Sequence, residues 1–276
     1  MLSGETFRYV YDKRRACFET LVFENIDILR GPVGINLWRA PTDNDQPLRG
    51  PWEQNGYDRY EVRGRTTDLM MSEDGCEIRT EYVISAVSLP NIGRGTAGYM
   101  IGRDGSIRVS ISFSRREDAP VLPRFGIRLF LPDSMESISY FGFGPGESYC
   151  DKHRSSTKHL YTDQVSRMHV DYIRPQENGA RYNCDHLRIE NEEMSLEVQG
   201  EGFCFNASHY TQEELTRKKH NFELKPSRMT VLCLDACQNG IGSASCGPKL
   251  ASQYETPRDI QLSLYLQPAR KETGLS

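Results

Sequence analysis

The feature that most constrains the fold is a strict alternation of apolar and polar residues that recurs along the chain. In residues 106–114, every second position is apolar: Ile107, Val109, Ile111 and Phe113. The same two-residue period recurs in 76–84, 125–131 and 260–267. Successive side chains of a strand point to opposite faces, so this pattern is typical of antiparallel sheet with one face packed on a partner layer. We predict an all-β fold of packed antiparallel sheet.

Helical signals are few, and nothing marks a domain boundary. Thr211 and Glu214 match a capping box, in which Thr211 caps the first free amides and Glu214 reaches back to the cap. The polar stretch that follows ends near His220, which limits this helix to a short one. The chain has no internal repeat, low-complexity segment or flexible linker. We therefore predict a single domain over residues 1–276 with one or two short helices.

Charge and hydropathy exclude two classes of partner. The chain has 38 acidic and 34 basic side chains, a net charge of −4, which does not suit a protein that neutralises nucleic-acid phosphates. No apolar run approaches the roughly 20 residues that a membrane helix needs. The first five residues, Met1 to Glu5, lack the basic and apolar regions of a signal peptide. We predict no nucleic acid, no membrane and a cytoplasmic location.

The eight cysteines support the same location and do not predict a metal site. They are scattered, with no CxxC pair, as is usual for buried thiols in a reducing compartment. Cys233 and Cys237 lie four apart, but no second pair follows to complete a four-ligand zinc site. We predict no metal ligand and no cofactor in this chain.

The usual catalytic signatures are also missing. The sequence has no GxSxG, GxxxxGK[ST] or HExxH motif. The glycine-rich segment 142–146 contains Pro145, which has no amide to offer a phosphate, so we interpret it as a tight turn. Thirty-eight carboxylates guarantee some close pairs, so no glycosidase pair can be chosen from spacing. We predict no catalytic residue in this chain.

Five dense polar and aromatic motifs do stand out. In the first, Trp38 and Arg39 precede Asp43, Asn44 and Asp45. An aromatic face, a guanidinium and carboxylate or amide groups either hold sugar hydroxyls or lock one part of a protein against another. We favour the structural or interface role for this motif. The other four motifs span 122–128, 143–152 with Glu147, 172–179 with Glu177 and Asn178, and 240–248 with Ser245, Cys246 and Gly247.

These motifs, in this order, resemble the C-terminal domain of the large β-galactosidases of glycoside hydrolase family two. The same domain occurs as the small subunit of two-chain β-galactosidases. The resemblance covers essentially the whole chain and includes segments 7–13 and 205–210. It implies a β supersandwich similar to galactose mutarotase, which agrees with the alternation. Because Met1 lies close to the family's domain boundary, we expect an excised segment rather than a separate small subunit.

The resemblance also implies an activity and partners. The family hydrolyses terminal β-galactose residues, as in lactose, with two glutamates about 5–5.5 Å apart. Both belong to a (β/α)8 barrel, and no alternation of apolar strands and helices exists in this chain. The implied partners are the remaining domains or large subunit and a β-galactoside. Magnesium and sodium ions of the parent enzyme are expected mainly outside this chain.

Two departures from the family pattern affect the expected site. The family places a tryptophan platform for the sugar leaving group in the loop that matches 240–248, and Cys246 stands in its place. A thiol has no aromatic face, so we expect altered selection of the leaving group, with Ser245 and Gly247 beside it. Ser148 stands where the family usually has asparagine, which removes a two-sided hydrogen-bonding amide and weakens the expectation of a precise polar role there.

Two other functions remain open from the residues alone. A sugar epimerase of the mutarotase fold needs an acid and a base across the sugar ring, and Glu177 with His169 or His186 could supply them. A free carbohydrate-binding module needs exposed aromatic platforms, and the two tryptophans, Trp38 and Trp52, are the candidates.

Overall fold

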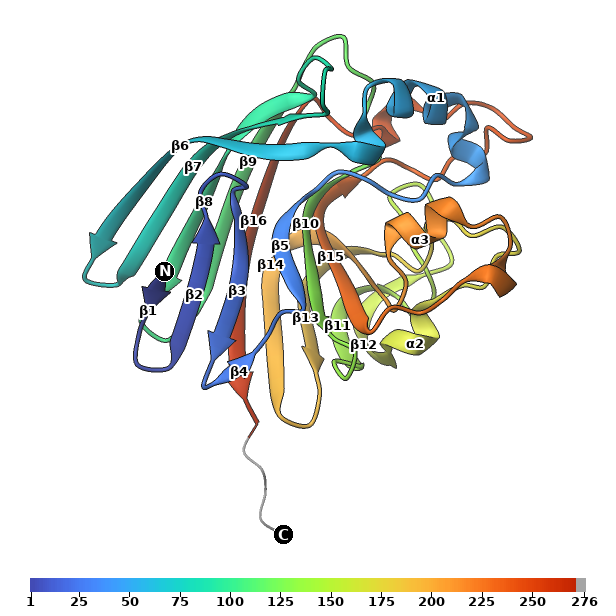
Figure 1. The fold of residues 1–276 in the computed structure, drawn as a ribbon. Helices are drawn as coiled ribbons and strands as arrows, with labels where there is room; N and C mark the ends of the chain where they lie inside the picture. Colours follow the sequence, from blue (N-terminus) through green and yellow to red (C-terminus); the bar gives the residue numbers. More distant parts are fainter. Residues whose placement is uncertain (272–276) are drawn as a thin grey trace.

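The structure is a computed structural model that describes residues 1–271. It is built almost entirely from β-strands (Figure 1). The strands are β1 (Leu2–Ser3), β2 (Phe7–Asp12), β3 (Cys17–Phe23), β4 (Ile26–Asp27), β5 (Gly31–Asn36), β6 (Glu61–Ser72), β7 (Gly75–Ser85), β8 (Gly93–Gly102), β9 (Ile107–Arg115), β10 (Arg124–Pro132), β11 (Ser137–Gly144), β12 (Thr157–Gln164), β13 (Arg181–Glu190), β14 (Met194–Ser208), β15 (Met229–Gln238) and β16 (Asp259–Arg270).

The strands form one long antiparallel sheet that curls until its two ends face each other. Its order is β1-β2-β3-β5-β10-β15-β14-β16-β9-β8-β7-β6, and β13, β11 and β12 extend from β14. The hydroxyl of Tyr11 on β2 donates to Thr80 Oγ1 on β7 at 2.9 Å, although the two strands lie at opposite ends of this order. Phe18 on β3 packs edge-on against Tyr99 on β8, with 5.0 Å between ring centroids. The curled sheet therefore encloses a core between two layers, as a supersandwich does.

The predicted all-β fold is confirmed, and all four alternating segments are strands. In β9, Ile107, Val109, Ile111 and Phe113 are all buried. β9 lies between β8 and β16, where Ile111 faces Ala97 on one side and Leu262 on the other. This register brings apolar faces of three strands together, which is the unit of sheet stabilisation. Apolar residues of both layers form one continuous buried cluster.

Residues 1–271 contain three short helices: α1 (Gln46–Gln54), α2 (Val165–Met168) and α3 (Gln212–Arg217). Four 3-10 turns accompany them: Asp43–Asp45, Tyr57–Arg59, Asn221–Glu223 and Ser252–Tyr254. The predicted helix is α3, and Thr211 caps it by accepting from the Glu214 amide at 3.1 Å. The second half of the capping box is wrong, because the Glu214 carboxylate accepts from the Lys225 amide instead, at 3.1 Å.

The sequence did not predict α1, the longest helix. Two prolines and a glycine within it weaken its helical signal, so tertiary packing must hold it in place. Trp52 supplies that packing: its ring is fully buried, and its indole N–H donates to the Val121 carbonyl at 2.7 Å. α1 thereby covers the end of the sandwich from which the loop 38–45 emerges (Figure 1).

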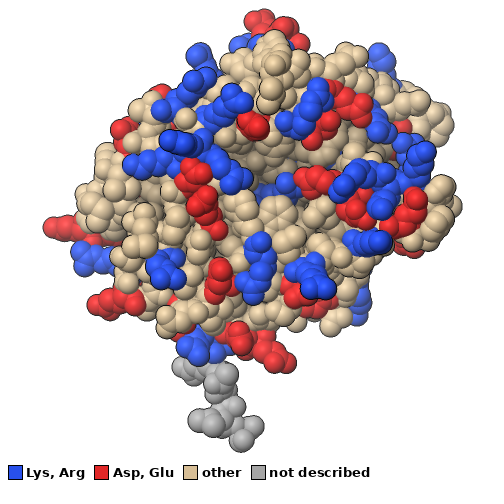
Figure 2. Space-filling model, in the orientation of Figure 1, with Lys and Arg blue, Asp and Glu red and all other residues tan. Residues whose placement is uncertain are grey.

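No helix within residues 1–271 is long and apolar enough to cross a membrane. Basic and acidic side chains are interspersed on the face shown in Figure 2, around a central hollow. The predicted domain ends at 276, in the segment 272–276 that lies outside the described residues, so a single domain over the whole chain stays a prediction.

Candidate functional site

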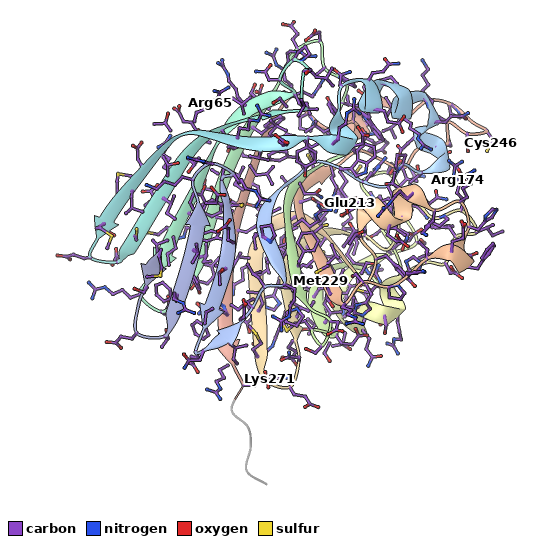
Figure 3. All side chains as sticks on the ribbon, in the orientation of Figure 1. Arg65, Arg174, Glu213, Met229, Cys246 and Lys271 are labelled. Carbon is purple, nitrogen blue, oxygen red and sulfur yellow. The ribbon has the colours of Figure 1, made fainter. Side chains whose placement is uncertain are left out.

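The loops that carry the motifs gather at one end of the sandwich. Figure 3 labels Cys246 and Arg174 at the same end of the molecule, although they are far apart in the sequence. Arg174 contacts the Asp43 carboxylate at 3.5 Å, and the Glu177 amide donates to the Ala40 carbonyl at 3.0 Å. Loops that follow β5, α2 and β15 therefore meet in one place.

A buried ion pair, Arg39 with Asp45, fixes the first motif to the loop after β15. The guanidinium contacts the two carboxylate oxygens at 3.1 and 2.6 Å, and both side chains are buried. It also donates to the carbonyls of Asn239 at 2.5 Å and Gly240 at 3.1 Å. Burial alone would lower the pKa of Arg39, but the nearby acidic groups, Asp45 first among them, outweigh it and raise that pKa, so the guanidinium stays charged. Within this chain, the motif therefore holds two loops together.

Two further side chains hold the loop that carries Cys246. The Asn44 amide donates to the Gly242 carbonyl at 2.8 Å and accepts from the Ser245 amide at 3.0 Å and hydroxyl at 2.6 Å. The Asp151 carboxylate accepts from the amides of Ile241 at 2.9 Å and Gly242 at 2.7 Å. The loop is thus fixed before its turn, at Ile241 and Gly242, and within the turn, at Ser245.

The predicted loop residues themselves are accessible. Ser245, Cys246 and Gly247 are all exposed, and Cys246 is the one cysteine among the described residues that is fully in this class. The Ser245 hydroxyl donates to the Asn44 side chain. The side-chain group at the tip that remains available to a ligand is therefore the thiol of Cys246. An anchored loop with an exposed tip is suited to contact another molecule or domain.

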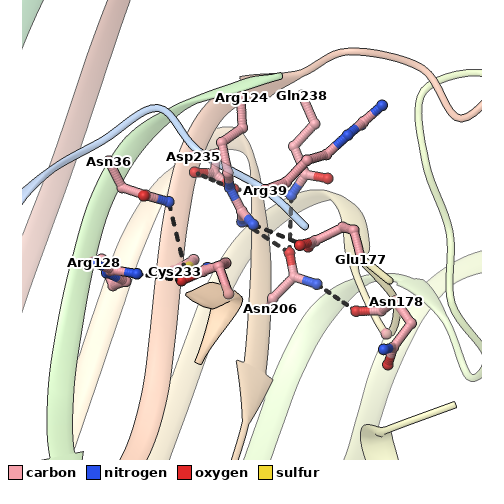
Figure 4. Close-up of polar contacts among 12 residues, drawn as sticks. Asn36, Arg39, Arg124, Arg128, Glu177, Asn178, Asn206, Cys233, Asp235 and Gln238 are labelled. Carbon is pink, nitrogen blue, oxygen red and sulfur yellow. Dashed lines mark hydrogen bonds and ion pairs between the residues drawn. The ribbon is translucent and has the colours of Figure 1, made fainter. Parts of the chain in front are cut away.

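Beneath these loops lies a buried polar network centred on Arg124 of β10 (Figure 4). Arg124 is ion-paired with Asp235 on β15 and with Glu177 at 2.9 Å. It also donates to Asn206 on β14 at 2.9 Å, and Asn206 in turn donates to the Asn178 carbonyl at 2.7 Å. Burial raises the pKa of Glu177, although Arg124 opposes the rise. This network joins three strands to the loop 172–179.

Glu147 and Asn178 fasten the same loop from the other side. The Glu147 carboxylate accepts from Lys152 at 2.5 Å, the Tyr172 hydroxyl at 2.6 Å and the Gly179 amide at 3.0 Å. Burial pushes the pKa of Glu147 upward, but these hydrogen bonds together hold it below its usual range. The Asn178 side chain accepts from the Val170 amide at 2.9 Å.

Comparison with known proteins connects this site with an enzyme family. The family model described as Beta galactosidase small chain matches residues 3–266. The chain belongs to this β-galactosidase small-chain family. It is 41% identical over 248 residues to a β-galactosidase of Actinobacillus pleuropneumoniae, a match that covers 90% of this chain and 24% of that one. A Staphylococcus xylosus β-galactosidase is 33% identical over 268 residues, which cover 96% of this chain and 27% of that one.

The chain therefore spans about a quarter of the length of these curated relatives. Solved structures agree on the fold. A putative aldose 1-epimerase from Escherichia coli K12 has a TM-score of 0.50 at 10% identity and covers 98% of each chain. A galactose mutarotase-like protein from Lactobacillus casei has a TM-score of 0.51 at 10% identity and covers 98% of this chain and 99% of that one. The predicted mutarotase-like supersandwich is confirmed.

Ser148 has a defined polar role in the small-chain motif 143–152. The replacement of asparagine weakened that expectation, yet Ser148 is fully buried and hydrogen-bonded on two sides. Its hydroxyl donates to the Phe143 carbonyl at 3.0 Å and accepts from the Tyr182 amide at 3.0 Å. A hydroxyl can both donate and accept, so serine replaces the two-sided amide in a tighter space.

The tryptophans of this small-chain member are not sugar platforms. Trp38 and Trp52 are buried and pack edge to face, with 6.2 Å between ring centroids. The Trp38 indole donates to Thr216 Oγ1 at 3.3 Å. A sugar ring needs an exposed aromatic face, so neither residue offers the platform that a free binding module requires.

The residues considered for an epimerase are not brought together either. Within residues 1–271, no hydrogen bond or ion pair joins Glu177 to His169 or His186. His186 lies 4.0 Å from the Glu197 carboxylate, and His169 packs against the ring of Tyr210. The same part of the chain contains no group of three or more histidine, cysteine or acidic side chains spaced to hold a metal ion.

Sequence reasoning missed Arg124, Asp151, Asn206 and Asp235 as members of the site. Arg124 and Asp151 lie inside motifs that stood out, but nothing in the spacing separates them from their neighbours. Asp235 is the one charged residue of β15, a largely apolar and buried strand, where a charged residue indicates a buried partner. This single charge in β15 was the signal from which a buried ion pair could have been predicted.

Proposed function

We propose that this chain is a non-catalytic part of a β-galactosidase, where it completes the pocket for the sugar leaving group and the interface with the rest of the enzyme. The observation that carries the proposal is the match to the small-chain family over nearly the whole chain, at only a quarter of the length of relatives named β-galactosidase. The partners are the remaining domains or large subunit and a β-galactoside such as lactose.

The chemistry of the two motif glutamates supports a non-catalytic role. Retaining hydrolysis needs one accessible carboxylate as nucleophile and one carboxyl as acid and base. Glu177 is buried and held by Arg124, and Glu147 is committed to three hydrogen bonds. Neither can move onto a sugar carbon without dismantling the loops it fastens. The catalytic glutamates therefore belong to the part of the enzyme outside this chain.

The contribution of this chain to the substrate pocket is the loop tip at Ser245, Cys246 and Gly247. Asn44 and Asp151 position that tip, so it meets the substrate without being ordered first. Cys246 supplies a small polarisable group in place of an aromatic face. The pocket therefore favours leaving groups that do not depend on stacking.

A grafting experiment tests this proposal. In the Actinobacillus pleuropneumoniae β-galactosidase, the segment that this chain matches is deleted and then replaced with this chain. We expect the deletion to abolish hydrolysis of a chromogenic β-galactoside and the graft to restore it. A deleted enzyme that keeps its activity would contradict the assignment of this segment to the pocket. So would a folded graft that stays inactive.

An aldose epimerase is the second candidate, favoured by the whole-chain likeness to mutarotase folds. Burial of Glu177 in an ion pair weighs against it, because that residue was the nominated base. Polarimetry on fresh α-galactose decides between the two functions. Our proposal expects the optical rotation to drift at the uncatalysed rate, whereas an epimerase would accelerate it.

We also propose a cytoplasmic location and no cofactor of this chain's own. All eight cysteines are free thiols, which suits a reducing compartment. Any magnesium or sodium ion that the whole enzyme needs would bind mainly outside this chain. Mass spectrometry of the purified whole enzyme and of this chain alone tests where the metal resides.

A further inference from the structure

A second candidate site lies in the central hollow of the concave face, in the middle of the view in Figure 2. The hollow has a volume of about 550 Å³ and lies between β5, β10, the turn after β2 and the start of β6. Ligand pockets for small molecules have volumes in this range. Its charged lining residues are Arg14, Arg15, Asp58, Glu61, Arg63, Arg128 and Glu213.

The fold brings three of these arginines to one rim. The Gly64 amide donates to the Arg14 carbonyl at 2.7 Å, which joins β6 to the turn after β2. A Cβ on Gly64 would lie 2.0 Å from the Lys13 carbonyl oxygen, so only glycine permits this approach. The contact places Arg63 beside Arg14 and Arg15. The Asp12 carboxylate accepts from the amides of Arg14 and Arg15 and fixes their turn.

The fourth arginine, Arg128, lies deeper, on β10. Its side chain is only 18% exposed, and its guanidinium lies over the Phe130 ring, 4.9 Å from the centroid. Nη1 donates to Gln212 at 2.5 Å and to Glu213 at 2.8 Å, which holds the group in place. Gly34 faces Arg128 across the strand pair, so no side chain of that residue fills the hollow beside it.

The charges of the hollow do not cancel. Glu61 pairs with Arg63 at 2.8 Å, Glu213 with Arg128 at 2.8 Å, and Asp58 with Arg59 outside the hollow at 2.8 Å. Each acidic group of the lining therefore has a cation already. Within residues 1–271, Arg14 and Arg15 form no ion pair, so two guanidiniums remain for a ligand.

The aromatic residues of the hollow do not favour an uncharged sugar. Trp38 is buried, and Tyr60 and Phe130 are half-buried, with Arg128 over one face of the Phe130 ring. A neutral sugar ring held mainly by stacking would find no fully exposed aromatic ring there. Oxyanions suit the site better, because planar guanidiniums bind carboxylate and phosphate in a bidentate way.

We infer that this hollow binds a small ligand of monosaccharide size that carries a phosphate or carboxylate group. Arg14 and Arg15 contact the oxyanion at the rim, and the body of the ligand lies toward Arg128. The site is separate from the Cys246 loop and does not depend on the proposed role of that loop. It would give the enzyme a place for an anionic sugar other than its substrate.

Calorimetric titration of the purified chain tests the inference. The ligands are glucose 6-phosphate, glucuronate, inorganic phosphate and, as the uncharged control, glucose. We expect saturable binding of glucose 6-phosphate or glucuronate that weakens as salt is added, and none of glucose. Inorganic phosphate shows whether the sugar part of the ligand contributes to binding. If inorganic phosphate binds as tightly as glucose 6-phosphate, the site recognises the oxyanion alone, and the inference of a ligand of monosaccharide size is wrong.

Two double variants locate the binding. Arg14→Gln with Arg15→Gln should weaken binding about tenfold or more, the loss expected for charge-assisted hydrogen bonds. Arg79→Gln with Arg94→Gln removes two exposed arginines outside the hollow and should leave the affinity unchanged. The inference is overturned if neither anionic sugar binds, if glucose binds equally well, or if both double variants weaken binding alike.

Discussion

Replacement of Arg39 by methionine is the sharpest test of the lock at the loop end. The change keeps much of the side-chain volume but leaves Asp45, which is 2% exposed, without its counterion. It also leaves the carbonyls of Asn239 and Gly240 without the donors that Arg39 supplies. Removing one partner of a buried ion pair costs about 3–5 kcal/mol. The whole free energy of unfolding of such a protein is about 5–15 kcal/mol.

The matched control is Arg49→Met. Arg49 and Glu53 also form an ion pair, at 2.8 Å, but the two side chains are 40% and 43% exposed. An exposed pair of this spacing contributes only about 0.3–0.5 kcal/mol. Both variants break an ion pair, so the larger loss of unfolding free energy expected for R39M should come from the burial of its pair.

The assay is urea unfolding of the wild type and both variants, followed by fluorescence and circular dichroism. If R39M does not fold, Asp45→Asn provides a milder change, because an amide still accepts from the guanidinium. Loss of its charge should cost about 1.5–3 kcal/mol. An R39M protein no less stable than R49M would refute the reasoning that the buried pair locks the loops.

Three further predictions concern the same end of the molecule. Because hydrogen bonds hold the pKa of Glu147 below its unfolded value, its contribution to stability is present above that value and is lost as the pH falls through the folded pKa. Glu147→Gln should therefore destabilise at pH 7 and lose that effect as the pH falls through the folded pKa, which urea unfolding over a series of acidic pH values checks. A difference between the two proteins that does not change with pH would contradict it. Asp151→Asn should speed hydrogen exchange of the backbone amides of Ile241 and Gly242 about tenfold or more, because hydrogen bonds to a charged group contribute about 1.5–3 kcal/mol. The control variant Asp259→Asn should leave the exchange of these two amides unchanged. In the assembled enzyme, Cys246→Trp should lower KM for aryl β-galactosides without changing unfolding; a KM that does not change would remove the loop tip from the pocket.

The strands were predictable because their signal is local. A strand such as β9 buries every second residue, so nine consecutive residues of the sequence already show the alternation of apolar and polar side chains. Helix α1 lacks such a local signal, because its helix breakers are overcome by the burial of Trp52 against a distant loop. The fate of Glu214 was equally non-local, since the amide of Lys225 competes for its carboxylate.

In the candidate site, too, local contacts could be predicted from the sequence and long-range contacts could not. Arg39 and Asp45 lie in one motif, six residues apart, and a lock between them could be proposed from the sequence. Arg124 and Asp235 are 111 residues apart and meet because β10 pairs with β15. Asn44 and Ser245 are 201 residues apart and meet only where the loops after β5 and β15 come together. Polar residues of those types are common along the chain, and no local pattern says which two will meet.

The central claim is that this chain belongs to a β-galactosidase but does not catalyse the reaction itself. The most direct measurement is hydrolysis of a chromogenic β-galactoside by the purified chain, alone and mixed with the matching remainder of the enzyme, with their association followed by size-exclusion chromatography. We predict activity only in the mixture, in the fractions where the two parts elute together. Hydrolysis by the chain alone would contradict the claim, and so would a stable complex of the two parts that hydrolyses nothing.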